Sequence, residues 1–163
     1  MFEKIKTRFP IFNKKPNLVF LDSAASALKV DDMINAVNNC YSYEYSNIHR
    51  GVYELSAKLT QKFEDSRLKI AEFISAPSSE NIIFTKSATE SINLVANSFT
   101  EDFLNDGDEV IISYLEHHAN IVPWHIAQRN KKFKLVPIEI NDLGEIDYND
   151  FNDKINSKTK LIA

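Results

Sequence analysis

Short apolar runs alternate with longer amphipathic stretches along this chain. Runs rich in β-branched and aromatic residues predict strands at 18–21, 81–84, 110–112, 133–140 and 159–163. Between them, apolar side chains recur every three to four residues, which predicts helices at 31–45, 55–74, 88–99, 124–130 and around 151–155. Strands that alternate with helices predict an α/β fold whose mostly parallel sheet carries flanking helices and is buried on both faces.

Local signals refine these elements. Asp31 or Asp32 is placed to cap the first long helix, and Pro137 predicts an edge or irregular strand. The strand that starts at Thr159 is expected to be central in the sheet. Within the predicted helix 31–45, four residues at helical spacing are expected to form a buried face: Met33, Val37, Cys40 and Tyr41. Cys40 is therefore interpreted as a small buried hydrophobe rather than a nucleophile.

A polar cluster follows the apolar run 110–112. It contains Glu116, His117, His118 and Asn120, and Pro123 then suits the first turn of a helix. In open α/β sheets, ligands bind at the carboxyl ends of strands, so these side chains are candidates for a site. Adjacent loop histidines are also often only solvated, and spacing alone leaves both interpretations open. A zinc site has less support, because the chain has no Cys-x-x-Cys or His-Glu-x-x-His pattern.

A second candidate lies at the predicted helix start after the run 81–84. Residues 87–90 fit the capping box Ser-x-x-Glu, which secures a helix start without any ligand. A helix start also offers free backbone N–H groups and the positive end of the helix dipole, which suit a phosphate. Thr89 would add a hydroxyl donor.

Composition narrows the classes of protein. The 163 residues suit one domain, and the net charge is −4 with no basic block, so no nucleic-acid partner is expected. No run is long enough to span a membrane, and residues 1–12 lack a secretory apolar region. A single cysteine excludes a disulfide framework and a cysteine metal cluster. We therefore expect a cytoplasmic protein with no membrane partner and no metal.

The nine residues 116–124, Glu-His-His-Ala-Asn-Ile-Val-Pro-Trp, resemble the signature of SufS-type cysteine desulfurases. These are pyridoxal-phosphate enzymes of fold type I, related to the class V aminotransferases. Segments 21–25, 47–56 and 85–96 resemble further family motifs, in the family's order. The resemblance covers essentially the whole chain, which would be about the N-terminal two-fifths of a full-length enzyme.

The resemblance implies roles for particular residues. His117 would stack on the pyridine ring of pyridoxal 5'-phosphate and move protons, as the catalytic residue of this part of the enzyme. Ala88, through its backbone, and Thr89 would hold the cofactor phosphate. The residues implied for the substrate pocket are Ala24, His49, Arg50 and Asn120. Two positions depart from the family pattern: this chain has Tyr53 where the family often has a second histidine, and Ser87 where the family usually has a glycine.

The implied activity is removal of sulfur from L-cysteine, which gives L-alanine and an enzyme persulfide for iron-sulfur cluster assembly. The family also implies a homodimer and a sulfur-acceptor protein. Its Schiff-base lysine and nucleophilic cysteine lie in a C-terminal part that this chain lacks. We therefore expect a fold incomplete at its C-terminus: an inactive fragment with a lead-in at 1–20 and the start of the large cofactor-binding domain at 21–163. Alternatives are a selenocysteine lyase, another class V aminotransferase-type enzyme, and a non-enzymatic remnant or binding module.

Overall fold

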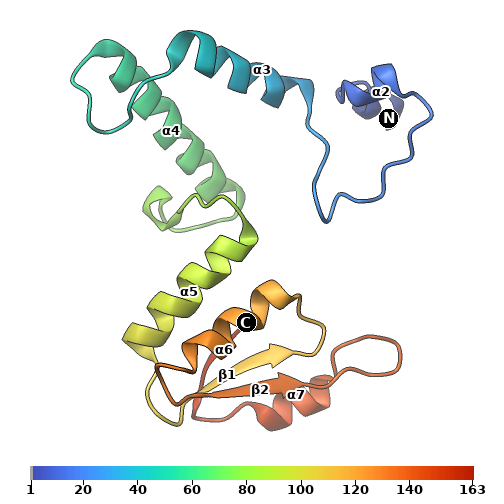
Figure 1. Cartoon of the computed structure of the whole chain (residues 1–163), viewed down its shortest axis with the longest axis vertical. Helices are drawn as coiled ribbons and strands as arrows, with labels where there is room; N and C mark the ends of the chain where they lie inside the picture. The colour runs from blue at the N-terminus through green and yellow to red at the C-terminus, as the bar shows by residue number, and fades with distance from the viewer. Residues whose placement is uncertain (1) are drawn as a thin grey trace. The chain divides into compact units, whose positions relative to one another are not determined.

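The computed structural model describes residues 2–163, which form two compact units. Among these residues, unit 1 ends at Ile83 and unit 2 is Phe84–Ala163 (Figure 1). No feature of composition marks this boundary, which falls within the predicted strand 81–84. The assignment of 21–163 to one cofactor-binding domain stays a prediction.

Unit 1 consists of helices and connecting segments. Its elements are α1 (Phe2–Lys6), α2 (Ile11–Lys14), α3 (Asp31–Asn39), the π-helical turn η1 (Cys40–Glu44), α4 (Glu54–Phe73) and the 3₁₀ turn η2 (Ser79–Asn81). The helices expected at 31–45 and 55–74 are confirmed. Asp31 and Asp32 lie in the first turn of α3, but its N-cap residue is Val30 and makes no side-chain cap. Asp32 instead pairs with Arg8 at 2.6 Å.

Two strand predictions in and beside unit 1 are wrong. Residues 18–21 have no regular secondary structure, and Leu21 is 90% exposed. Residues 82–84 follow η2 as irregular backbone, and Arg67 donates to the carbonyl oxygen of Ile82 at 3.2 Å. An apolar run can become a strand only beside a partner strand, and the residues that the structure describes supply none here.

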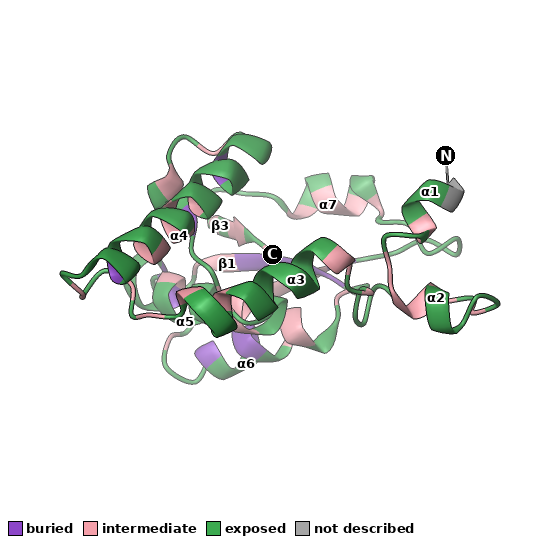
Figure 2. Ribbon diagram, turned by 90° about the horizontal axis from the view of Figure 1, so that it is seen from above, coloured by how far each residue is buried: buried purple, intermediate pink, exposed green. Residues whose placement is uncertain are grey.

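The predicted apolar face of α3 and η1 is not buried within the described chain. Met33 and Val37 are exposed, Tyr41 is 71% exposed, and Cys40 is partly buried. The spacing of these residues is helical, as predicted, but nothing within residues 2–163 covers the stripe that they form. The prediction that they belong to the core is therefore wrong for this part of the chain (Figure 2).

Unit 2 contains the α/β layers that the sequence predicts. Its elements are α5 (Ala88–Phe103), β1 (Glu109–Ser113), the 3₁₀ turn η3 (His118–Asn120), α6 (Val122–Ala127), β2 (Lys134–Ile138), α7 (Tyr148–Lys154) and β3 (Thr159–Ile162). The strands are parallel in the order β2-β1-β3. Pro137 lies on the outer strand β2, as predicted, because a residue without an N–H is tolerated at an edge. Among the described strands the central one is β1, not β3 as expected.

The core of unit 2 lies on one face of β1. Val110 and Ile112 point to this face, where α5 contributes Ala96 and α6 contributes Trp124 and Ala127. Helices α6 and α7 lie on opposite sides of the strands (Figures 1 and 2). Trp124 is only 1% exposed, so its truncation to alanine would cost about 3–5 kcal/mol. The first turn of α6 is therefore anchored firmly beneath the end of β1.

Helix α6 is shorter than predicted. It ends at Ala127, and the N–H groups of Arg129 and Asn130 bond three residues back, to Ile126 and Ala127, at 3.0 Å. Such bonds tighten the last turn instead of continuing the helix. Lys131 then donates to the carbonyl oxygens of Glu101 and Leu104 at 2.8 and 3.0 Å, which ties this turn to the end of α5.

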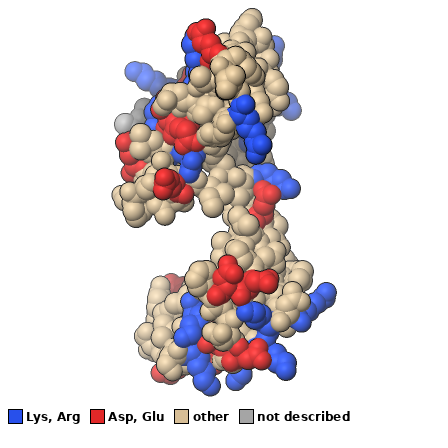
Figure 3. Space-filling view, turned by 90° about the vertical axis from the view of Figure 1, so that its left-hand side faces the viewer, with Lys and Arg blue, Asp and Glu red and all other residues tan. Residues whose placement is uncertain are grey.

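The charged side chains do not separate by sign on the surface that Figure 3 draws. On the face drawn in Figure 3, Lys and Arg side chains are interspersed with Asp and Glu. Over residues 2–163, no helix combines the length and the apolar character that crossing a membrane requires.

Candidate functional site

The end of β1 carries an ordered loop. Ser113, the last strand residue, accepts the N–H of Leu115 at 3.2 Å and donates its hydroxyl to Glu116 Oε1 at 2.9 Å. Asn120 Nδ2 donates to the other oxygen of Glu116 at 2.9 Å, and the indole Nε1 of Trp124 donates to Asn120 Oδ1 at 3.0 Å. Side-chain hydrogen bonds therefore run without interruption from the strand to the following helix.

His117 lies in the middle of this loop. It is the N-cap residue of η3, and its Nδ1 accepts the N–H of Ala119 at 3.1 Å. In the neutral imidazole the hydrogen must then be on Nε2. The ring is exposed, and the His118 ring stands edge-on to it at 88° with centroids 6.1 Å apart. The faces of the two rings therefore point in different directions.

The start of α5 lies in the same unit, and α5 packs against η3. Ser87 is the N-cap residue, and its hydroxyl accepts the N–H of Glu90 at 3.1 Å, so the predicted capping interaction is confirmed. Glu90 in turn accepts the N–H of Lys86 at 2.7 Å, one residue earlier than a standard capping box requires. The N–H groups of Ala88 and Thr89 have no acceptor inside the helix, which is the arrangement that binds anions.

Serine causes no strain in place of the family's glycine at position 87. Its φ is −167°, which is extended backbone that any residue adopts. The substitution therefore leaves the helix start free to hold a phosphate. A cavity of about 290 Å³ adjoins these elements and is lined by Ser91 and Ile92 of α5, by Asn120 and Trp124, and by the end of β3. The structure thus brings the first turns of α5 and the His117 loop to one edge of the sheet.

The other predicted site residues, Ala24, His49 and Arg50, belong to unit 1. Ala24 lies in an exposed turn closed by the Ser26 N–H and the Asp22 carbonyl at 3.1 Å. His49 has a φ of +63°, which is uncommon for a residue other than glycine. Its N–H donates to Thr60 Oγ1 at 3.0 Å, so α4 helps to hold this conformation. Arg50 is exposed beside it.

His49 also contacts α4 through its ring. Nε2 lies 3.3 Å from Glu64 Oε1, and the ring stands edge-on to Phe63. Gly51 lies very close to Ser56 and Tyr53, so that a Cβ added to it would lie 2.5 Å from Ser56 Oγ. The loop that presents His49 and Arg50 is therefore packed tightly onto the first turns of α4.

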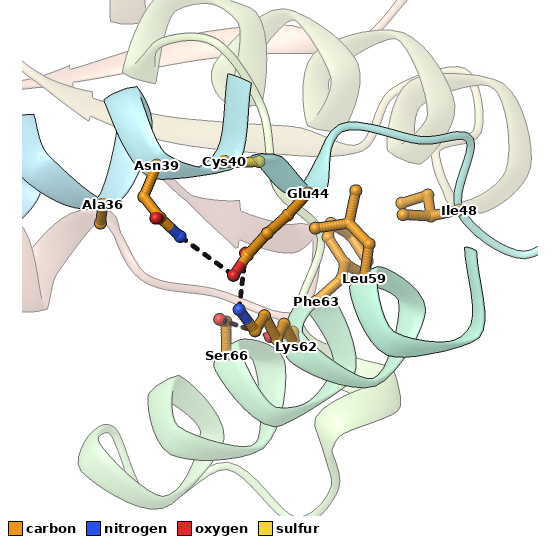
Figure 4. A pocket seen from close by; sticks show the side chains of 9 residues that line it. All are labelled: Ala36, Asn39, Cys40, Glu44, Ile48, Leu59, Lys62, Phe63 and Ser66. Atoms are coloured by element: carbon orange, nitrogen blue, oxygen red, sulfur yellow. Dashed lines mark hydrogen bonds and ion pairs between the residues drawn. The ribbon is translucent and has the colours of Figure 1, made fainter. Parts of the chain in front are cut away.

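Unit 1 also contains an open pocket of about 450 Å³ between α3, η1 and α4. Figure 4 shows Glu44 in it, between Asn39 Nδ2 at 2.9 Å and Lys62 Nζ at 2.6 Å. The hydrogen bond from Lys62 is the main reason why the pKa of Glu44 lies below its ordinary value. Sequence reasoning missed this pair, and an 18-residue separation offers no local signal for it. Over residues 2–163, no three His, Cys, Asp or Glu side chains gather as a metal site would require.

The hydrogen bonds of Glu116 and Asn120 were also missed. The spacing Glu116–Asn120–Trp124, four residues at each step, is a signal that could have found them, since side chains at this spacing can meet on a helical turn. The amide oxygen of Asn120 accepts one hydrogen bond and its amide nitrogen donates one within the chain. The second amide hydrogen remains available to a substrate.

Comparison with known proteins gives concordant results. Residues 19–163 match the family described as "Aminotransferase class-V". The chain is 41% identical over 165 residues to a probable cysteine desulfurase of Vibrio cholerae, and 43% identical over 164 residues to a cysteine desulfurase of Serratia proteamaculans. These alignments cover 99% of this chain but 41% and 40% of the two relatives, respectively. The chain therefore spans about two-fifths of the length of these relatives.

Comparison with solved structures also finds cysteine desulfurases. The apo cysteine desulfurase of Thermococcus onnurineus NA1 superimposes with a TM-score of 0.88 at 34% identity, over 98% of this chain and 38% of that one. The cysteine desulfurase CsdA of Escherichia coli gives a TM-score of 0.82 at 33% identity, over 98% of this chain and 40% of that one. The prediction of an α/β fold of the pyridoxal-phosphate-dependent type is thereby confirmed.

Proposed function

Because the chain belongs to the aminotransferase class-V family, we propose that the full-length protein is a pyridoxal-phosphate-dependent cysteine desulfurase. It removes sulfur from L-cysteine, leaving L-alanine and a persulfide on the enzyme. The observation that carries the proposal is the pairing, in unit 2, of an anion-binding helix start with the His117 loop at the end of β1. The similarity to cysteine desulfurases supports this reaction over others in the family.

The residues present fit the cofactor. The N–H groups of Ala88 and Thr89 and the hydroxyl of Thr89 are available to hold a phosphate, and the dipole of α5 favours negative charge there. The exposed ring of His117 is available to pack against the pyridine. The His117 loop follows the carboxyl end of the parallel strand β1, where ligands of α/β sheets bind, and α5 packs against the η3 turn of this loop.

Each of these residues has a distinct task in the proposed mechanism. Bound pyridoxal phosphate supplies an electron sink for the substrate carbon next to nitrogen. Ala88 and Thr89 fix the position of the phosphate and with it the orientation of the ring. Since Nδ1 of His117 already accepts the Ala119 N–H, Nε2 is the atom that holds and moves a proton near the substrate.

The substrate-binding residues belong to the same proposal. The residues that the resemblance implies for L-cysteine are Ala24, His49 and Arg50 of unit 1 and Asn120 of unit 2, and the guanidinium of an arginine suits a carboxylate. The full-length protein is a cytoplasmic homodimer that passes persulfide sulfur to an acceptor protein for iron-sulfur cluster assembly. These partners follow from the resemblance to the SufS-type enzymes.

The test uses the full-length protein with added pyridoxal phosphate. We expect a bound-cofactor absorption band, and alanine and sulfide in equal amounts when L-cysteine and a thiol reductant are added. Alanine released only from selenocysteine would identify a selenocysteine lyase, and transfer of the amino group without sulfide would identify an aminotransferase. A protein with no cofactor band and no product would refute the proposal in favour of a non-enzymatic module.

A further inference from the structure

We propose that Glu116, Asn120 and Trp124 form a positioning relay that holds the His117 imidazole at the end of β1. The inference rests on the proposed function only in taking the cofactor as the group that His117 faces. The relay itself is a property of this chain's own side chains. It gives Asn120 a task beyond the substrate contact that the resemblance implies, because its amide also acts through the loop.

The relay is anchored in the core at both ends. Ser113, which bonds to Glu116 at 2.9 Å, is 8% exposed on the central strand. Trp124, which donates to Asn120 at 3.0 Å, packs in the core of unit 2. The two middle members, Glu116 and Asn120, are joined at 2.9 Å and flank the histidines on either side. A loop held at both ends and bridged across its middle has few conformations left to adopt.

His117 lies inside the bridge. Its carbonyl oxygen accepts the Asn120 N–H at 2.8 Å, and its Nδ1 accepts the Ala119 N–H at 3.1 Å. The backbone of Asn120 thus holds the backbone of His117, while the side chain of Asn120 is held by Glu116 and Trp124. If the hydrogen bonds of the Asn120 side chain are broken, the turn around His117 becomes more mobile. This turn sets the direction of the imidazole ring, in which Nε2 is the nitrogen not bonded to the Ala119 N–H.

Hydrogen-bond chemistry makes an amide the group required at position 120. An indole N–H can only donate, and an ionised carboxylate can only accept. Asn120 must therefore present its oxygen to Trp124 and its nitrogen to Glu116, as observed. An aspartate has the same shape but no donor, so it would face Glu116 as a second carboxylate. Asn120→Asp thus breaks one link by charge alone, with little change in volume.

The experiment uses the full-length protein, both without cofactor and with added pyridoxal phosphate. Hydrogen exchange over residues 113–121 reports the order of the loop. The dissociation constant and the induced circular dichroism of the bound cofactor report the placement of the ring. Gln128→Ala is the matched control, because it removes another partly buried side-chain bond in the same unit, from Gln128 Nε2 to the Phe133 carbonyl at 2.9 Å.

We expect Asn120→Asp at pH 8 to raise loop exchange at least tenfold without cofactor, and to weaken cofactor binding at least tenfold. Trp124→Phe, which keeps an aromatic ring and removes the donor, should act in the same direction. Gln128→Ala should leave the loop and the induced dichroism as in the unmodified protein.

Two results would overturn the relay: equal loop exchange in Asn120→Asp and the Gln128→Ala control, or faster loop exchange with unchanged cofactor affinity and dichroism. An unmodified full-length protein that binds no pyridoxal phosphate would instead overturn the proposed function. In that case the exchange measured without cofactor still decides whether the relay orders the loop around His117.

Discussion

Gly51→Ala is expected to destabilise the loop that carries His49 and Arg50. A Cβ at position 51 would lie 2.5 Å from Ser56 Oγ, 2.6 Å from Ser56 Cβ and 2.7 Å from a ring carbon of Tyr53. Real Cβ atoms do not approach other heavy atoms this closely, so the loop or α4 must move. The φ of Gly51 is not in the left-handed region, so crowding and not backbone strain sets the cost.

The size of the effect depends on Ser56, which cannot move freely. It is fully buried in the first turns of α4, and its hydroxyl donates to the Asn47 carbonyl at 2.6 Å. Overpacking a tight site costs about 1–3 kcal/mol, and loss of this hydrogen bond adds about 1 kcal/mol. The sum is about 2–4 kcal/mol, which corresponds to roughly a 30- to 900-fold change in a local opening equilibrium.

Hydrogen exchange of the full-length protein measures this directly. Exchange over residues 47–60 should accelerate by that factor in Gly51→Ala. Gly107→Ala is the control, because its φ of +90° makes the substitution strained while a Cβ there meets nothing within 4 Å, and position 107 lies in unit 2, outside the loop of His49 and Arg50. Adding Ser56→Ala to Gly51→Ala should recover only part of the loss, because the contact with the Cβ remains. The reasoning would be refuted if exchange over residues 47–60 in Gly51→Ala stayed within about threefold of that in the unmodified protein, because the expected change in the local opening equilibrium is larger.

Three further predictions concern unit 2. In the full-length protein, His117→Ala should weaken cofactor retention or slow turnover and change the cofactor spectrum more than His118→Ala does; equal effects would refute the assignment of the pair. Thr89→Ala should weaken pyridoxal phosphate binding by about 1–3 kcal/mol, measured by equilibrium titration, and unchanged affinity would leave this helix start with a capping role only. The pKa of Asp150 lies below the ordinary value of 3.8, chiefly because it accepts the Glu139 N–H and then because of Lys154. A carboxylate with a lowered folded pKa stabilises the fold above its unfolded pKa and loses this effect as the pH falls through the folded value. The melting temperature of Asp150→Ala should therefore lie below that of the unmodified protein at pH 7 and converge with it well below pH 3.8; a constant difference would contradict the assignment.

The sequence predictions that succeeded concern residues that interact with near neighbours in the sequence. The cap at Ser87, the strand at Val110–Ile112 and the helix start at Pro123 all depend on residues within one or two turns of each other. Short-range hydrogen bonds and side-chain periodicity determine such features, so the sequence alone determined them. The motif around His117 and the fold class it implies were also readable from the sequence, because they are carried by contiguous residues.

Only the tertiary structure decided features that require a distant partner. The runs at 18–21 and 82–84 have strand composition but no neighbouring strand, and the apolar stripe of α3 has the right spacing but no cover within the described residues. The bridge from Glu116 through Asn120 to Trp124 has a local signal in its four-residue spacing, but the turn between β1 and α6 decided that the three polar groups align. A strand and a buried face each need groups from elsewhere in the fold, and the linear pattern carries no information on whether those groups are present.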